Sequence, residues 1–166
     1  CILCEENSYL YIDRNIGRII KIKITENNFP FMGKLAQGTC VIKLFPNEKV
    51  IEALSFPEKV QKDLILITKN GFFIKHSTKE IKTSKKGELG IMGINFKDNK
   101  RIKDRAISCF INNTYVYIKT DKDRYKKLIN DQIYNSSYKK EKKLNIELNN
   151  NEFIKSTFSM IIPEEI

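Results

Sequence analysis

A run of lysines beside two glycines is the feature of this sequence best suited to chemistry. In KEIKTSKKGELG, residues 79 to 90, four lysines precede the first glycine, and a second glycine closes the segment. Glycine lets a backbone come close to a phosphate group, and flanking ammonium groups neutralise its charge. This pattern indicates contact with a phosphate backbone regardless of base sequence. The candidate contact residues are Lys82, Lys85, Lys86, Gly87 and Gly90.

Two further segments carry lysines in a similar setting. GKLAQG, residues 33 to 38, places Lys34 between two glycines, and SSYKKEKK, residues 136 to 143, has four lysines but no glycine. In the second of these, Lys139 and Lys140 are the candidate contacts. A single basic loop is most often a solvated surface loop. Three such loops at equivalent points of a repeated structure would lie along one charged rim.

The net charge of +10 permits a polyanion as partner but does not by itself establish one. Of the 30 basic residues only five are arginine, and the chain is rich in Ile, Asn and Lys. An AT-rich genome produces the same skew, because it raises the lysine content of all its proteins. The position of the lysines must therefore decide between nucleic-acid binding and compositional bias.

Residues for catalysis or metal binding are few. His76 is the one histidine, and no Ser or Cys with a base beside it is evident. Cys1 and Cys4 form a single C-x-x-C, whereas a structural zinc site needs four converging ligands. We expect no catalytic residue and no metal site. No apolar run approaches the roughly 18 residues of a membrane span, so we expect no membrane contact.

A hairpin is predicted by LILITKNGFFIK, residues 64 to 75. Two apolar runs flank Asn70-Gly71, a pair that tolerates the positive φ angles of a two-residue type I′ turn. Similar windows are YLYIDRNIGRIIKIKI (9 to 24) and YVYIKTDKDRYKKLI (115 to 129). A helix over residues 120 to 134 is an alternative, but the alignment with the other two hairpins favours strands.

A second element follows each hairpin at a similar distance. The three are GTCVIKLFPNEKVI, LGIMGINFKDNKRI and KKLNIELNNNEFI, in which Ile42, Ile94 and Ile146 are 52 residues apart. A period near 50 made of hairpins is typical of a β-propeller, whose blades bury their faces on one another. Continuous apolar runs such as LILI fit strands packed between blades. We expect an all-β propeller of about four-stranded blades.

The repeats are expected at about residues 1–57, 58–110 and 111–166, within a single domain or fragment. Residues 155 to 166 also suggest part of a fourth repeat. The chain opens on Cys1 rather than Met, which is expected of a fragment.

These coordinated motifs resemble the C-terminal domain of the DNA gyrase A subunit. The resemblance covers residues 2 to 110, from SYLYIDRNIGRIIKIKI and AQGTCVIKLFPNEKVIEAL to GIMGINFKDNKRI, and is weaker beyond them. It implies a six-bladed, pinwheel-type propeller whose basic rim wraps duplex DNA. That wrap supports negative supercoiling driven by ATP, and the implied partners are the rest of the same gyrase polypeptide, together with the gyrase B protein. It also implies no cofactor in this domain, since ATP and Mg are used elsewhere in the enzyme.

The family's wrapping motif, Q-R-R-G-G-K-G, is matched only in part. The nearest segment is SKKGELG, where Lys85 and Lys86 match the arginines by charge and Gly87 and Gly90 match two glycines. Glu88 and Leu89 replace a glycine and the lysine, which weakens this loop as the principal anchor.

Three alternatives remain open at this stage. The related subunit of topoisomerase IV shares much of this motif pattern, so its equivalent domain is one alternative. A propeller used as a protein-interaction scaffold, whose positive charge comes from composition alone, is another. For the compartment, the AT-rich composition favours the apicoplast, the plastid of apicomplexan parasites. The bacterial cytoplasm is the alternative.

Overall fold

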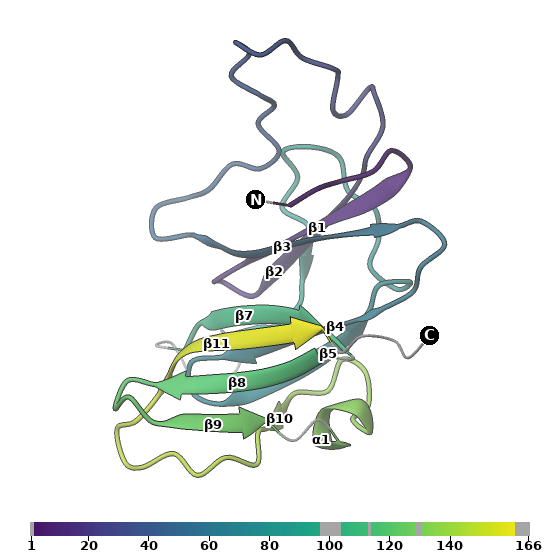
Figure 1. The fold of residues 1–166 in the computed structure, drawn as a ribbon. Coiled ribbons are helices and arrows are strands. Elements are labelled where there is room, and N and C mark those ends of the chain that lie inside the picture. The colour runs from purple at the N-terminus through teal and green to yellow at the C-terminus, as the bar shows by residue number, and fades with distance from the viewer. Residues whose placement is uncertain (1, 97–103, 113, 129–130, 162–166) are drawn as a thin grey trace.

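The chain folds into three antiparallel β-sheets stacked on one another, as the computed structural model shows (Figure 1). The structure describes residues 2–96, 104–112, 114–128 and 131–161. Apart from the four-residue helix α1 (Asp131–Tyr134), every regular element in this part of the chain is a β-strand. The predicted all-β class is therefore confirmed. No helix in these ranges has the length and apolar character needed to span a bilayer.

Sheet A is built around the first predicted hairpin. β1 (Ser8–Arg14) and β2 (Arg18–Lys23) pair with each other, with Tyr11 opposite Lys21. β3 (Val50–Pro57) adds to β1 and the short β6 (Ile91–Met92) adds to β2, giving the order β3-β1-β2-β6.

Sheet B repeats this arrangement around the second hairpin. β4 (Asp63–Thr68) pairs with β5 (Phe72–Ser77), β7 (Ala106–Ile111) adds to β4, and β10 (Lys142–Lys143) adds to β5. The strand order β10-β5-β4-β7 is that of sheet A written from the other edge.

Sheet C has three strands in the described part of the chain. β8 (Thr114–Thr120) lies between β11 (Ile154–Ile161) and β9 (Tyr125–Leu128). Residues 114–128 thus form a hairpin, and α1 is the helical part of the window from 120 to 134 among the described residues. Residues 155–161, which the sequence suggested as part of a fourth repeat, belong to β11 and pair with β8 in sheet C. Residues 162–166 lie outside the described ranges.

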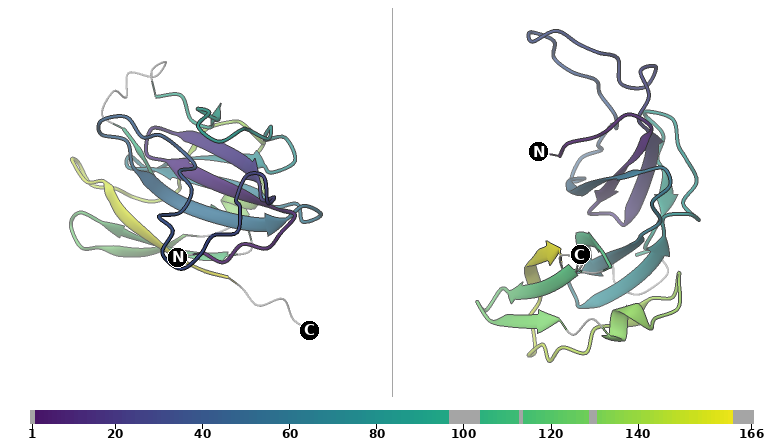
Figure 2. Two further views of the ribbon diagram at one scale, coloured as in Figure 1. Left: turned by 90° about the horizontal axis from the view of Figure 1, so that it is seen from above. Right: turned by 45° about the vertical axis from the view of Figure 1, so that its right-hand side comes forward.

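The outer strand of a sheet comes from the following repeat. β6 and β10 each lie more than 60 residues after the hairpin to which they add, and each occupies the edge opposite the long third strand. The third strands β3, β7 and β11 lie next to one another at the inner edge of the stack. Each sheet therefore has an inner edge and an outer edge. The chain passes from the inner strand of one sheet to the next sheet, and it returns to the outer edge of the earlier sheet to add β6 or β10. Figure 2 shows the three sheets from two further sides.

The three hairpin turns share one geometry, which differs from the predicted type I′. The amides of Gly17, Gly71 and Asp123 each donate to the carbonyl three residues earlier, at 2.9, 3.0 and 3.1 Å. These three residues have positive φ, whereas Asn70 does not. This is a type I turn followed by one left-handed residue. The predicted hairpin is confirmed and its turn type is wrong, because Asn70 does not take positive φ and only the residue after the turn, Gly71, does.

The continuous apolar strand β4 lies in sheet B and packs against a neighbouring sheet on each of its two faces, as the sequence predicted. Leu64 and Leu66 face sheet A, while Ile65 and Ile67 face sheet C, and all four are fully buried. Burying such a side chain contributes about 1.5–3 kcal/mol. The stack of three sheets is held chiefly by these two apolar layers.

The 52-residue register has a structural counterpart. Ile94 lies in the layer between sheets A and B, and Ile146 packs against the layer between sheets B and C. Ile42 packs on the remaining face of sheet A, against Leu10 and Ile12. Ile94 and Ile146 therefore cover their own sheets on the side toward the preceding sheet, and Ile42 covers the corresponding face of sheet A.

Candidate nucleic-acid interface

Loop 79–90 crosses from sheet B to the outer edge of sheet A. The buried side chain of Ile81 anchors its start between the two sheets. The amide of Ser84 then donates to the carbonyl of Lys21 on β2 at 2.7 Å, and the loop ends in β6. Its middle portion is thereby held along the outside of the stack.

Three lysine side chains in this loop are open to solvent to differing degrees. Lys82 and Lys85 are exposed and Lys86 is half-buried. The carboxylate of Glu88 accepts a hydrogen bond from the amide of Lys85 at 3.0 Å, which closes the turn. The predicted lysines are thus presented to solvent, with a carboxylate at the end of the turn.

The two glycines of this loop have structural roles of their own. Gly90 has φ +68°, and a Cβ there would lie 2.2 Å from the carbonyl oxygen of Ile19. Gly87 has φ +81° with open space around it, and its amide donates to the carbonyl of Val41 at 2.9 Å. Their close approach is to neighbouring backbone, so phosphate contact by Gly87 and Gly90 stays a prediction.

Loop 136–143 occupies the equivalent position on sheet B. Ile133, 52 residues after Ile81, is buried between sheets B and C just before the loop begins. The amide of Lys139 donates to the carbonyl of Lys75 on β5 at 2.8 Å, and the loop ends in β10. Lys139 and Lys140 are exposed.

The second loop is braced by an aromatic side chain in place of glycine. The hydroxyl of Tyr138 lies 3.0 Å from the carboxylate of Asp63, and the ammonium of Lys75 lies 4.6 Å from the centre of its ring. Lys139 also adopts φ +57° without being glycine. Lys139 therefore supplies the positive φ that a glycine would supply, and the contacts of Tyr138 hold the loop in place.

An ion pair connects the two loops. Nζ of Lys139 lies 2.6 Å from the carboxylate of Glu80, and the hydrogen bond from Lys139 lowers the pKa of Glu80. The two loops therefore meet at this pair, and their lysines lie on a strip of surface along the outer edges of sheets A and B. This strip is called the basic strip below.

Lys34 lies elsewhere. Its loop, 33–38, belongs to the long segment between β2 and β3, which extends from the end of the stack formed by sheet A (Figure 1). Lys34 is exposed, and loop 33–38 follows the edge of no sheet in the described residues. The structure brings together Lys82, Lys85, Lys86, Lys139 and Lys140 but not Lys34.

Two arginines that support loop 79–90 were not predicted. Arg14 is fully buried, pairs with Glu48 at 3.1 Å and donates to the carbonyl of Leu89. Arg18 donates to the carbonyl of Gly90 at 3.2 Å. The only signal in the sequence is the R-N-I-G-R turn, which does not reveal partners more than 70 residues away.

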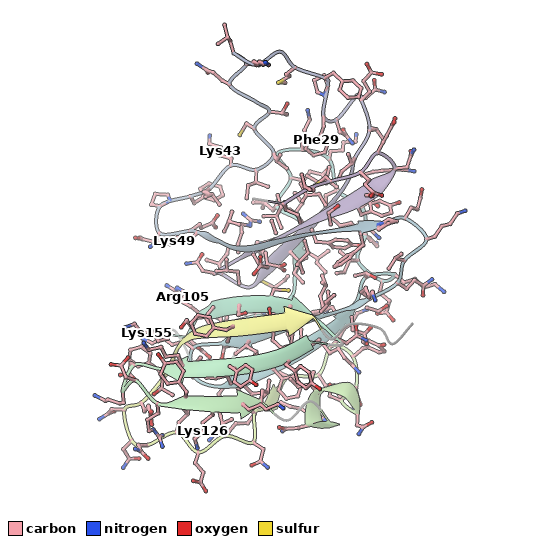
Figure 3. All side chains as sticks on the ribbon, viewed as in Figure 1. Phe29, Lys43, Lys49, Arg105, Lys126 and Lys155 are labelled. Carbon is pink, nitrogen blue, oxygen red and sulfur yellow. The ribbon has the colours of Figure 1, made fainter. Side chains whose placement is uncertain are left out.

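Other basic residues were also missed by the sequence analysis. Lys49, Arg105 and Lys155 are exposed and lie near the start of the third strand of successive sheets. Figure 3 shows them down one side of the stack. α1, which leads into loop 136–143, lies on the other side in the same view (Figure 1). Lys49, Arg105 and Lys155 thus form a second set of positive charges, separate from the basic strip.

His76 belongs to the interior. It is buried on β5, and its Nε2 lies 2.9 Å from the carbonyl oxygen of Gly93, while burial lowers its pKa. In the described ranges, no three His, Cys, Asp and Glu side chains gather as a metal site would require. The histidine thereby connects β5 of sheet B to the segment directly after β6.

The stacked four-stranded sheets, each completed by a strand from the following repeat, define a propeller-type domain. The family model for the DNA gyrase C-terminal domain, beta-propeller, matches residues 15–57 and 62–110, which is more than half of the chain. The chain belongs to this family. No curated protein sequence matches it significantly.

Solved structures show the same fold. The C-terminal domain of DNA topoisomerase IV matches with a TM-score of 0.75 and 13% identity over 94% of this chain and 47% of that one. The E. coli ParC C-terminal domain matches at 0.63 and 15%, over 95% and 62%. The DNA gyrase A C-terminal domain matches at 0.57 and 20%, over 75% and 38%. The present chain thus spans about 40–60% of these domains.

Proposed function

We propose that this domain binds duplex DNA along its basic strip and bends the duplex around the outer edges of its sheets. The observation that carries the proposal is the equivalent placement of loops 79–90 and 136–143 on neighbouring sheets, joined by Lys139 and Glu80. Lysines spaced along a curved edge attract successive phosphates, so the bound duplex follows the curve. The proposed contacts are Lys82, Lys85, Lys86, Lys139 and Lys140, with Gly87, Gly90 and Lys34 as further candidates.

The domain would act by binding alone. We propose no catalytic group, cofactor or metal in it, because the basic strip is built from lysines held by backbone hydrogen bonds. Residues 1–166 would form one wrapping unit of three repeats, at about 1–57, 58–110 and 111–166.

For the parent protein we propose the DNA gyrase A polypeptide. The family model that matches the chain carries the gyrase name. The domain would then work with the rest of that polypeptide, and with the gyrase B protein, to introduce negative supercoils, while ATP and Mg are used outside this domain. The equivalent role in topoisomerase IV is the alternative, favoured by the likeness to that enzyme's C-terminal domain. Supercoiling of relaxed plasmid by the assembled enzyme supports gyrase, whereas decatenation without supercoiling supports topoisomerase IV.

The compartment is proposed from composition. Lysine and asparagine are abundant and arginine is scarce, as in AT-rich plastid-bearing parasites, so we propose the apicoplast. Localisation of the tagged parent protein, with an apicoplast marker in the same cells, tests this. A bacterial source would place it in the cytoplasm.

The salt dependence of DNA affinity tests the basic strip. Replacing Lys85 and Lys86 together by Ala should reduce the slope of log K against log salt by roughly 1 to 2, because each phosphate contact contributes about 0.9. Lys139→Ala/Lys140→Ala should do the same. Lys49→Ala/Lys155→Ala removes the same charge from the other side of the stack (Figure 3) and serves as control. If all three variants lose equal slope, the strip is not the binding site.

Wrapping is tested separately from binding. A nicked circle is closed with ligase while the domain is bound, and the linking number is then measured. A shift in linking number supports a wrapped path, and its loss in Lys85→Ala/Lys86→Ala assigns the path to the strip. Binding without any shift would contradict wrapping. An affinity no greater than that of a control protein of equal charge would favour the interaction scaffold.

A further inference from the structure

A polar pocket lies between sheets A and B, at the strand ends away from the hairpin turns. Its volume is about 200 Å³, and its walls come from β1, β2, the segment after β5 and the connection between β3 and β4. A water molecule in the liquid takes up about 30 Å³, so the pocket has room for a small anion together with water. Both of its sheets lie within the described chain, so the pocket belongs to the stack itself.

The ammonium group of Lys21 is buried beside this pocket. Lys21 is 8% exposed, and its Nζ donates to the carbonyl of Thr78 at 3.0 Å and lies 4.3 Å from the ring centre of Tyr9. An ammonium has three N–H donors, and among the described residues the bond to Thr78 uses one of them. Burial lowers the pKa of Lys21, while the charge of Glu58 raises it. An anion next to Nζ would therefore stabilise the charged form.

The charges around the pocket are mainly positive. Glu58 lines it, but its carboxylate accepts hydrogen bonds from Nζ of Lys23 at 3.0 Å and from the hydroxyl of Tyr9 at 3.1 Å. Lys79, which also lines the pocket, is exposed. One carboxylate thus stands against the ammonium groups of Lys21, Lys23 and Lys79.

Sheet B contains a lysine in the position equivalent to Lys21. Lys75 on β5 lies opposite Ile65 as Lys21 on β2 lies opposite Tyr11. The carbonyl of Lys75 accepts the amide of Lys139 at 2.8 Å, and the carbonyl of Lys21 accepts the amide of Ser84 at 2.7 Å. The two crossing loops are therefore in register at these hydrogen bonds.

On sheet B this lysine is covered by its crossing loop. The residue before the bonded amide is Tyr138, whose ring centre lies 4.6 Å from Nζ of Lys75 and whose hydroxyl binds the carboxylate of Asp63 at 3.0 Å. In loop 79–90 the corresponding residue is Thr83, which is exposed and has no ring. Tyr9 stands where sheet B has Asp63, so the carboxylate is missing as well. The lysine of sheet A thus lacks both groups that cover its counterpart.

We propose that this pocket binds one phosphate group, which accepts hydrogen bonds from the ammonium of Lys21 and fills the place that Tyr138 and Asp63 occupy on sheet B. Hydrogen bonds between an ammonium and a phosphate are charge-assisted and therefore strong. Lys79 adds a second positive charge where loop 79–90 begins. The phosphate group comes from free phosphate or from the backbone of a duplex on the basic strip. Only the second source rests on the function proposed above.

Titration with inorganic phosphate tests the pocket directly. The lysine side chains of the full chain are labelled for NMR, and phosphate replaces chloride at constant ionic strength. We expect a saturable shift of the Lys21 signal, which is identified by its absence in Lys21→Met. This variant keeps the length of the side chain and should weaken phosphate binding by roughly tenfold or more in calorimetry, because charge-assisted hydrogen bonds are lost. Lys59→Met removes the same charge from an exposed residue outside the lining and should have a much smaller effect.

Two exposed positions provide variants that leave the buried layers untouched. Thr83→Tyr introduces the ring that the other crossing loop places over its lysine, and it should weaken phosphate binding. Glu58→Gln removes the carboxylate beside the pocket and should strengthen phosphate binding severalfold. Circular dichroism shows whether each variant retains its sheets. The proposal is overturned if phosphate causes no saturable shift at Lys21, if Lys59→Met loses as much affinity as Lys21→Met, or if neither exposed variant changes the affinity.

Duplex DNA distinguishes the two sources of the phosphate group. If the pocket takes a backbone phosphate, Lys21→Met should reduce the slope of log K against log salt by about 0.9. An unchanged slope, together with the shift at Lys21, assigns the pocket to free phosphate. The shift should persist in Lys85→Ala/Lys86→Ala, because these two lysines do not line the pocket. A failure of the basic strip to bind DNA would therefore leave the phosphate site intact.

Discussion

The ammonium group of Lys139 lies 2.6 Å from the carboxylate of Glu80, and this pair joins the two basic loops. Glu80 begins the crossing to sheet A, and Lys139 binds the edge of sheet B. The pair has two effects. It fixes the distance between neighbouring groups of lysines, and it partly neutralises one of the lysines proposed to contact DNA.

Removing the charge of Glu80 should strengthen DNA binding. In Glu80→Gln the ammonium of Lys139 becomes available to phosphate, so we expect about two- to threefold higher affinity at low salt and a steeper salt dependence. Fluorescence anisotropy with a labelled duplex measures both. Glu5→Gln makes the same charge change at the exposed N-terminal segment and should have a smaller effect. Equal gains in the two variants would mean that only net charge matters.

Most of the architecture could be predicted because its signals are local. Each of the first two hairpins is encoded by two apolar runs and a left-handed turn residue within about 16 residues, whereas the second strand of the third hairpin is the largely polar YKKL. Asp123 shows the limit of this reasoning, since it takes the place of glycine with φ +55° and is held by Lys119 at 2.9 Å. The turn type was missed because the sequence does not show which residue carries the positive φ.

The donated strands could not be predicted from local signals. β6 and β10 are two residues long, and β10 consists of Lys142 and Lys143, which have no preference for strand. Their pairing depends on sheets that form more than 60 residues earlier. The ion pair of Lys139 with Glu80 was missed for the same reason, because the two residues are 59 positions apart in the sequence. The sequence indicated only which lysines are exposed.

Acid should selectively weaken sheet C through Glu152. Hydrogen bonds from Arg124, at 2.8 Å from Nε, and from the amide of Asn149 lower the pKa of Glu152 to about 2. Its stabilising effect is therefore complete above about pH 4.3, the pKa in the unfolded chain, and is lost as pH falls toward 2. Glu152→Gln should lower the Tm at pH 7 and approach wild type near pH 2. Glu147→Gln, at an exposed position nearby, is the control.

A Tm difference for Glu152→Gln that is constant between pH 7 and pH 2.5 would contradict this prediction. It would mean that the side chain acts through packing, because packing does not titrate. The measurement is differential scanning calorimetry of both variants across this range.

The buried carboxyl group of Asp13 should have the opposite pH dependence. It lies fully buried near Cys109 between sheets A and B, and burial raises its pKa to about 7. The neutral form is favoured in the fold, so stability decreases as pH rises from about 4 to about 7. Asp13→Asn should remove this decrease and raise the free energy of unfolding at pH 8 by on the order of 2–4 kcal/mol. Urea denaturation of both proteins from pH 5 to 8 measures the free energy of unfolding. The same decrease with pH in Asp13→Asn as in the wild type would contradict this prediction.

Gly90 and Gly87 provide a matched pair for testing the crossing strand. Both have positive φ, so alanine at either position costs about 1–2 kcal/mol from backbone conformation. At Gly90 the added Cβ would also lie 2.2 Å from the carbonyl of Ile19, whereas Gly87 has open space. Gly90→Ala should therefore be the less stable variant in urea denaturation, with faster amide exchange at Ile91 as β6 detaches. Equal losses would show that β6 contributes little to holding sheet A.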